Sequence, residues 1–190
     1  IGMPGAGKST IGVVLAKKLG FDFIDSDLVI QNQYKKVLQE LINEYGTDGF
    51  EKIENDVNKG IKTTNSVIAT GGSAIYGEEA MEHFNNIGTI VYLNLPYEEI
   101  EQRLGNLEER GVTIKKGQTL KDLYNERTPL YKKYANVIVN CQDKTIRDIV
   151  EEITISPFVT SELTKIGMQE LLASKGISPS IVKLSNVRIR

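Results

Sequence analysis

The sequence predicts an α/β fold in which helices cover both faces of a parallel sheet. Two observations predict it. Short apolar runs alternate along the chain with amphipathic segments of helical period, the pattern of successive strand–helix–strand units. A glycine-rich phosphate-binding motif also stands at the start of the chain, directly before the first helical segment.

The spacing of apolar residues predicts the individual elements. The first helical segment has its apolar residues on one face and ends at Gly20. Gly46 is expected to break one helical stretch, and Pro129 to interrupt another. A polar, glycine-containing stretch over residues 105–119 is expected to be a loop. Strands are predicted at 21–25, 66–70, 89–95 and 136–140, and further helices at 27–33, 37–45, 50–61, 78–86, 97–104, 120–135, 145–153 and 160–174.

The composition narrows the class of protein. The chain has 190 residues, of which 40% are hydrophobic and 25% charged, which suits one domain of ordinary size with a small appendage. Lysine and arginine total 23 against 25 acidic residues, and this balance argues against a nonspecific nucleic-acid binder. A single cysteine, Cys141, and a single histidine, His83, exclude a disulfide framework and multi-histidine metal sites.

No apolar run approaches the roughly 20 residues that cross a bilayer, and no signal peptide is visible. We therefore expect a cytoplasmic protein that binds no membrane.

Residues 2–9 read Gly-Met-Pro-Gly-Ala-Gly-Lys-Ser and fit the P-loop pattern. Glycines let backbone N–H groups turn toward phosphate oxygens, and the following helix directs its positive end at the same phosphates. Lys8 supplies a positive charge to the β- and γ-phosphates, and the Ser9 hydroxyl is placed to bind Mg²⁺. We therefore expect ATP and Mg²⁺ as cofactors, with the nucleotide bound by Gly5, Ala6, Gly7, Lys8, Ser9 and Thr10.

A P-loop is expected to follow a buried strand, yet only Ile1 precedes Gly2. Two explanations stand. Either the first few residues of the strand are missing from this sequence, or the C-terminal stretch 181–184 or 187–189 supplies the strand. We prefer the first, because the C-terminal stretch alternates apolar and charged residues, whereas a central parallel strand is usually apolar on both faces.

Two features are expected on the acceptor side of the same cleft, at the carboxyl ends of strands. Asp25 and Asp27 follow the strand at 21–25. One carboxylate can serve Mg²⁺ and the other can accept a proton from a substrate hydroxyl; alternatively, the pair is a helix cap. Gly71 and Gly72 follow the strand at 66–70 and permit close approach of a ligand, or form a plain turn.

Together these motifs resemble those of the shikimate kinases. The matching features occur in the family's order: Gly2–Ser9, Asp25-Ser26-Asp27, Gly71-Gly72, the Arg103 and Arg110 pair, and Arg127–Tyr131. The resemblance covers residues 1–153. It implies a three-layer α/β/α P-loop kinase with a five-stranded parallel sheet and a lid, which transfers the ATP γ-phosphoryl group to a ring hydroxyl of shikimate.

The resemblance also implies roles for single residues. Lys8 would contact the transferring phosphate, and Ser9 and Asp25 would serve Mg²⁺. Asp27 would bind the acceptor hydroxyl and take its proton. Gly71 and Gly72 would line the acceptor pocket, Arg103 would lie near adenine, Arg110 would reach into the closed site from the lid, and Arg127 would bind the substrate carboxylate.

The sequence departs from the family pattern mainly where the acceptor is recognised. Glu51 follows Phe50 where the family has an arginine that binds the carboxylate, and Lys52 is a weak substitute because it points about 100° further round the helix. Ser73 replaces the third glycine after Gly71-Gly72. Arg110-Gly111-Val112 stands in place of the family's lid sequence.

Three functions therefore remain open at this point. The first is shikimate kinase, and the second is a kinase of another polyol or hydroxy acid, of the gluconate type, which Glu51 motivates. The third is a nucleotide-binding regulatory module, which residues 154–190 motivate as a C-terminal accessory segment with one helix and possible strands. We expect a hydroxylated acid as substrate and a monomer or weak homo-oligomer.

Overall fold

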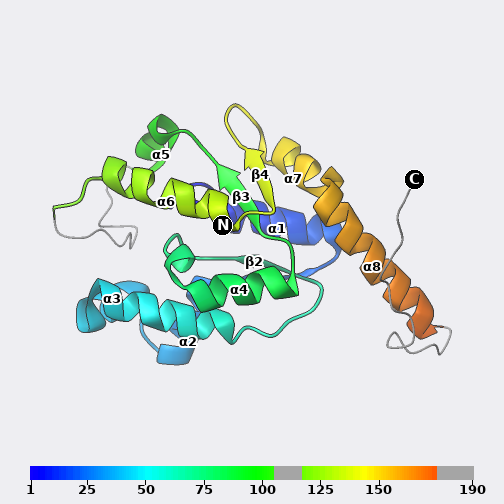
Figure 1. Cartoon of the computed structure of the whole chain (residues 1–190), viewed down its shortest axis with the longest axis horizontal. Coiled ribbons are helices and arrows are strands. Elements are labelled where there is room, and N and C mark those ends of the chain that lie inside the picture. The colour runs from blue at the N-terminus through cyan, green and yellow to red at the C-terminus, as the bar shows by residue number, and fades with distance from the viewer. Residues whose placement is uncertain (105–116, 175–190) are drawn as a thin grey trace.

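The computed structural model describes residues 1–104 and 117–174 of the chain. Within them, strands alternate with helices as the apolar spacing predicts (Figure 1). The strands are β1 (Asp22–Asp25), β2 (Ser66–Ala69), β3 (Val91–Asn94) and β4 (Val137–Asn140). The helices are α1 (Lys8–Leu19), α2 (Ser26–Tyr34), α3 (Leu38–Lys59), α4 (Glu78–Ile87), α5 (Tyr97–Leu104), α6 (Leu120–Tyr134), α7 (Ile146–Ile155) and α8 (Pro157–Ser174), with a 3₁₀ turn, η1 (Ala74–Tyr76).

The strands form two parallel pairs, and the expectation of one five-stranded sheet is wrong for the described residues. β1 pairs with β2, and β3 pairs with β4. Among residues 1–104 and 117–174, Ile1 alone bonds to the other edge of β3: its nitrogen donates to Val91 O at 2.8 Å and its oxygen accepts from Leu93 N at 3.0 Å. One residue makes a single rung of a ladder and is too short to join the pairs into one sheet.

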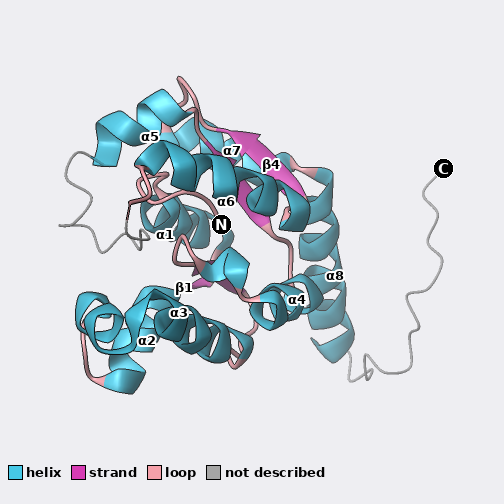
Figure 2. Cartoon of the chain, turned by 60° about the vertical axis from the view of Figure 1, so that its left-hand side comes forward, coloured by secondary structure: helices cyan, strands magenta, loops and turns pink. Residues whose placement is uncertain are grey.

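Helices cover the strand pairs. α2, α3 and α4 pack together on one side of the molecule, and α5 and α6 lie on the other side (Figures 1 and 2). α1 packs on β1 and β2, so closely that a Cβ at Gly12 would stand 2.7 Å from Phe23 Cε2 of β1 and 3.7 Å from Ala69 Cβ of β2. The larger apolar core joins α1, α4, α6 and α7 to the strands, and a smaller one lies between α2 and α3.

Of the two interruptions predicted within helical stretches, the one at Gly46 is confirmed and the one at Pro129 is wrong. The backbone leaves the helical region at Gly46 (φ 70°, ψ 175°), as expected of glycine there. Pro129, by contrast, does not interrupt α6, although it removes one backbone donor. The helix continues because Leu123, Arg127 and Tyr131 are buried on one face and hold its two halves in line.

Several expectations concern residues outside the described ranges: the lid with Arg110, and the candidate strands at 181–184 and 187–189. The helix expected at 160–174 corresponds to α8, which begins at Pro157 and extends away from α7 (Figure 1). Cys141 is buried in the core, as expected of a packing residue. Among the described helices, none has the length and apolarity that crossing a membrane would require.

Candidate active site

The glycine-rich turn before α1 has the backbone geometry of a phosphate-binding loop. Gly5 and Gly7 have φ angles of 79° and 87°, a region that favours glycine. Gly7 is the N-cap of α1 and offers no side chain to the first N–H groups of the helix. These donors, with the positive end of the helix dipole, are therefore available to an anion.

Lys8 is held at the base of this loop. Its Nζ donates to Gly2 O at 2.9 Å and to Met3 O at 3.0 Å. Burial lowers the pKa of Lys8 to about 8, although the nearby carboxylate of Asp27 opposes the shift. The ammonium therefore gains strongly from a negatively charged ligand, because such a ligand offsets the desolvation of the charge.

Asp25 is a helix cap, which is one of the two interpretations that the sequence left open, and it also contacts the P-loop. It ends β1 and caps α2, since its Oδ1 accepts from Asp27 N at 3.0 Å. Its Oδ2 accepts from Ser9 Oγ at 2.7 Å, which joins the P-loop to the acidic pair. A hydroxyl and a carboxylate are ligands that suit Mg²⁺, so these two residues fit the ion. The described residues include no cluster of three or more acidic, cysteine or histidine side chains able to hold a metal.

Asp27 lines the cleft one residue into α2. Burial, and secondarily the negative charge of Asp25, raise the pKa of Asp27, whereas Lys8 opposes the shift. A carboxylate with a raised pKa is a better proton acceptor than an exposed one, as long as it stays ionised at the working pH.

The opposite wall of the cleft carries a buried cation. Arg127 is only 2% exposed and donates from Nε to Tyr76 Oη at 3.2 Å. Its Nη1 would lie 3.1 Å from a Cβ at Gly72. Tyr131 holds this turn by donating to Gly72 O at 2.6 Å. A fixed, buried guanidinium favours binding of a carboxylate or phosphate.

Glu54 is a cleft residue that the sequence analysis missed. It is 1% exposed, and its Oε1 lies 2.2 Å from the point where a Cβ of Gly71 would stand. Asp27 Oδ1 lies 2.8 Å from the same point. Burial raises the pKa of Glu54 to about 7, against the opposing effect of Ser73. Its spacing in the sequence could have revealed it. Position 54 falls on the buried face of α3 together with Phe50, Ile53 and Val57.

These groups converge on one cleft of about 540 Å³ at the carboxyl ends of β1 and β2. Of the residues predicted for the site, ten line it, whereas Ala6 is buried behind the loop and Asp25 reaches it through Ser9. Arg103 lines the cleft and forms an ion pair with Glu99 at 2.9 Å. The lining predicted residues are Gly5, Gly7, Lys8, Ser9, Thr10, Asp27, Gly71, Gly72, Arg103 and Arg127.

The structure also shows where the residues that depart from the family pattern lie relative to the cleft. Ser73 lines the cleft and is buried. Lys52 is exposed on α3 and is not among the residues lining the cleft, so the idea that it substitutes for the missing arginine is not supported. Glu51 is half-buried, and its negative charge contributes to the raised pKa of Glu54.

A phosphate loop that faces an acidic pair and a buried arginine, between helix-covered parallel strands, defines the class of P-loop small-molecule kinases. The family model described as "Shikimate kinase" matches residues 4–156. The chain belongs to the shikimate kinase family.

Individual relatives agree with this assignment. A shikimate kinase of Clostridium botulinum (strain Eklund 17B / Type B) is 38% identical over 154 residues, 80% of this chain and 92% of that protein. One of Francisella tularensis subsp. holarctica is 37% identical over 166 residues, 85% of this chain and 93% of that protein.

Solved structures agree as well. A shikimate kinase from Acinetobacter baumannii in complex with shikimate superposes with a TM-score of 0.72 and 30% identity, over 92% of each chain. The shikimate kinase from Aquifex aeolicus has a TM-score of 0.71 and 31% identity, over 82% of this chain and 92% of that one.

Proposed function

We propose that this protein transfers the γ-phosphoryl group of ATP to a ring hydroxyl of shikimate. The observation that carries the proposal is the convergence of Lys8, Asp27 and Arg127 on one cleft. The three groups supply a cation for the phosphates, a carboxylate for the acceptor hydroxyl and a cation for the acceptor carboxylate. The relatives named shikimate kinase, one of them with shikimate bound, support this choice of acceptor.

On the ATP side, the backbone donors of the P-loop and the Lys8 ammonium bind and orient the phosphates. Phosphoryl transfer needs positioning and positive charge more than covalent chemistry. Lys8 moves from the carbonyls of Gly2 and Met3 to the phosphates when these arrive. Because its positive charge is buried, its attraction to the developing negative charge is screened less than it would be in water.

On the acceptor side, Asp27 orients the reacting hydroxyl and takes its proton as the phosphoryl group arrives. Arg127 holds the carboxylate of the acceptor and so sets the distance between that group and the reacting hydroxyl. The lack of a side chain at Gly71 lets Asp27 and Glu54 lie against this turn, on the acceptor side of the cleft.

The residues at the P-loop fit Mg²⁺, and the Ser9 hydroxyl and the Asp25 carboxylate would hold it. When bound, the ion would neutralise negative charge on the phosphates of ATP. Within the chain, Asp25 keeps the Ser9 hydroxyl directed toward the cleft through the 2.7 Å hydrogen bond.

A second acceptor class is favoured by one observation, the acidic pair Glu51 and Glu54 on α3. Glu54 lines the cleft, whereas Glu51 is outside its lining and acts on Glu54 through its charge. Acidic groups in this wall disfavour a carboxylate and favour hydroxyl groups, which can donate hydrogen bonds to Glu54. A neutral polyol is therefore the alternative acceptor.

The test is ADP release from Mg²⁺-ATP with and without shikimate, with a neutral polyol panel in parallel. Strong stimulation by shikimate is expected. Lys8→Ala should abolish it, since the variant removes charge from the transferring phosphate. Stimulation by a polyol and not by shikimate would identify a neutral polyol as the acceptor. ATP binding with no stimulation by any acceptor would contradict transfer altogether.

A further inference from the structure

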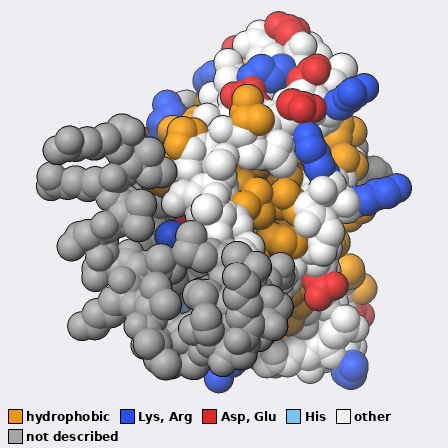
Figure 3. All heavy atoms as spheres, turned by 90° about the vertical axis from the view of Figure 1, so that its right-hand side faces the viewer, with side chains coloured by type: hydrophobic (Ala, Val, Ile, Leu, Met, Phe, Trp, Pro, Cys, Tyr) orange, Lys and Arg blue, Asp and Glu red, His pale blue; other side chains and the backbone are white. Residues whose placement is uncertain are grey.

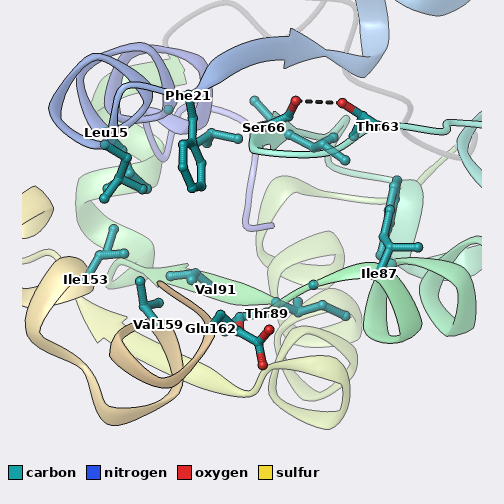
Figure 4. Close-up of a pocket in the computed structure, with 18 of the residues that line it drawn as sticks. Leu15, Phe21, Thr63, Ser66, Ile87, Thr89, Val91, Ile153, Val159 and Glu162 are labelled. Atoms are coloured by element: carbon teal, nitrogen blue, oxygen red, sulfur yellow. Dashed lines mark hydrogen bonds between the residues drawn. The ribbon is translucent and has the colours of Figure 1, made fainter. Parts of the chain in front are cut away.

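Outside the phosphate cleft, two regions of the described residues gather apolar side chains. Leu15, Ile153 and Val159 point into a cavity of about 260 Å³ between the strand pairs (Figure 4). On the face that carries α8, hydrophobic side chains gather at the centre between charged ones (Figure 3). Apolar contacts have no direction and depend on area, so these regions do not distinguish a carboxylate from a hydroxyl group. That distinction depends on the polar groups around Arg127.

Arg127 is held by Tyr76, the last residue of η1. Arg127 Nε donates to Tyr76 Oη at 3.2 Å, and the guanidinium carbon lies 5.2 Å from the centre of the Tyr76 ring. The tyrosine therefore contacts the arginine through its hydroxyl and through the face of its ring. Tyr76 is not among the residues that line the cleft, so its effect on a bound acceptor passes through Arg127.

The Tyr76 hydroxyl is itself oriented by Glu126. Tyr76 Oη donates to Glu126 Oε1 at 2.6 Å, and Gln118 Nε2 donates to Glu126 Oε2 at 2.6 Å. A hydroxyl has one proton, and Tyr76 gives it to Glu126, so only the lone pairs of its oxygen face Arg127. Burial, and secondarily the hydrogen bond to Glu126, raise the pKa of Tyr76 to about 12. The hydroxyl therefore keeps its proton at neutral pH.

The bond to Tyr76 decides which edge of the guanidinium faces the acceptor. An arginine binds a carboxylate either end-on, through both Nη groups, or side-on, through Nε and one Nη. Tyr76 accepts from Nε, which disfavours the side-on mode. Arg127 Nη1 lies 3.1 Å from the point where a Cβ of Gly72 would stand, and Gly72 lines the cleft. The Nη end of the guanidinium is thus the end directed at the acceptor.

The charge state of the tyrosine matters as much as its position. A carboxylate bonded to Nε would place a full negative charge beside the guanidinium and would weaken its attraction to an acceptor carboxylate. A neutral hydroxyl fixes Nε without that charge. Its bond to Glu126 polarises it, and this makes its oxygen a better acceptor for Arg127.

We propose that Tyr76, oriented by Glu126, positions Arg127 for end-on binding of the acceptor carboxylate. This inference rests on the proposed function, in which Arg127 binds that carboxylate. Tyr76 is a positioning residue, since it acts through the arginine. It also favours an acid over a neutral acceptor, because a rotated guanidinium loses one of two charged hydrogen bonds to a carboxylate.

The experiment compares Tyr76→Phe with the unmodified chain. Phenylalanine keeps the ring beside Arg127 and removes only the hydroxyl. The KM for shikimate should rise about tenfold, as expected for the loss of one charged hydrogen bond. The KM for ATP and the kcat at saturating shikimate should stay nearly unchanged, because the P-loop and Asp27 keep their contacts. General damage to the fold would instead alter all three constants and lower Tm.

Tyr97→Phe is the matched control. Tyr97 Oη donates to Glu101 Oε1 at 2.6 Å, so this variant also loses a tyrosine–glutamate hydrogen bond. Neither Tyr97 nor Glu101 lines the cleft. Tyr97→Phe should therefore leave the KM for shikimate and the KM for ATP unchanged.

Glu126→Gln tests whether the glutamate acts through the tyrosine. Alone, it should raise the KM for shikimate about threefold, since it removes the charge that polarises the hydroxyl. Combined with Tyr76→Phe, it should cause no further rise, because the hydroxyl that it orients is gone. Additive effects of the two substitutions would overturn the role given to Glu126.

A further readout needs no turnover. In NMR spectra of arginine-labelled protein, the Arg127 Nε–H should exchange slowly with water in the unmodified chain and about tenfold faster or more in Tyr76→Phe. Arg127→Lys identifies the signal by its loss. Faster exchange in Tyr76→Phe, in a protein that shikimate does not stimulate, would refute the proposed function and support the positioning of Arg127 by Tyr76.

Two results would overturn the proposal itself. One is turnover of shikimate with the same KM in Tyr76→Phe and in the unmodified chain. The other is an Arg127 Nε–H that exchanges equally fast in both proteins, which would mean that the tyrosine hydroxyl does not hold the guanidinium.

Discussion

Gly71 lies against Glu54 so closely that a Cβ at position 71 would stand 2.2 Å from Glu54 Oε1. The same Cβ would stand 2.8 Å from Asp27 Oδ1. No real side chain tolerates these distances, so the approach of two acidic groups to one backbone position depends on glycine. This contact joins α3 to the turn after β2 and shapes the acceptor side of the cleft.

Gly71→Ala should therefore impair acceptor binding. The added methyl group must displace Glu54 or Asp27, at a cost of about 1–3 kcal/mol, or roughly tenfold to a hundredfold in acceptor affinity. Steady-state kinetics should show a higher KM for the acceptor and little change in the KM for ATP. Gly88→Ala is the matched control, because a Cβ there meets nothing within 4 Å. Equal acceptor KM values in the two variants would contradict this role of Gly71.

Glu54→Gln should change how stability depends on pH. Burial raises the pKa of Glu54 from its ordinary value of 4.5 to about 7 in the folded protein, so the folded state binds the extra proton between these values. Stability is therefore lost as pH rises from about 4.5 to about 7, by about 3 kcal/mol.

The glutamine variant lacks this proton equilibrium, so its unfolding free energy should fall less between pH 5 and pH 8 in urea titrations. Glu78→Gln, at an exposed position on α4, is the control and should follow the unmodified protein. An identical pH dependence in all three proteins would mean that Glu54 ionises freely in the fold.

Asp27→Asn should separate nucleotide binding from transfer. The amide keeps the size of the side chain but cannot take a proton, so we expect kcat to fall by about 10²–10⁴. ATP affinity, measured by calorimetry, should change little because the P-loop contacts remain. Asp22→Asn, at the exposed start of β1, should retain full activity. Near-normal turnover of Asp27→Asn would remove the residue from the proposed proton transfer.

Glu51→Arg should improve binding of a carboxylate acceptor. The change removes a negative charge that acts on Glu54 and restores the arginine that the family pattern has there. An added charged hydrogen bond is worth about 1.5–3 kcal/mol, so the KM for shikimate should fall by about tenfold or more. Lys52→Arg, on the exposed side of α3, is the control and should leave KM unchanged. An unaltered KM in Glu51→Arg would mean that residue 51 does not face the acceptor.

Much of the fold followed from local patterns in the sequence. Leu93 and its neighbours form a strand because a short apolar run is flanked by Gly88 and Pro96, and α5 has the predicted bounds. The predicted interruption at Pro129 is wrong, because the burial of Leu123 and Tyr131 outweighs the loss of one hydrogen bond in α6.

The sequence by itself determined the P-loop, the acidic pair and Arg127, because each has a local motif whose spacing reflects its chemistry. Only the tertiary structure decided that Glu54 faces Asp27 and that Lys52 does not reach the cleft, since the rotation of α3 depends on its packing.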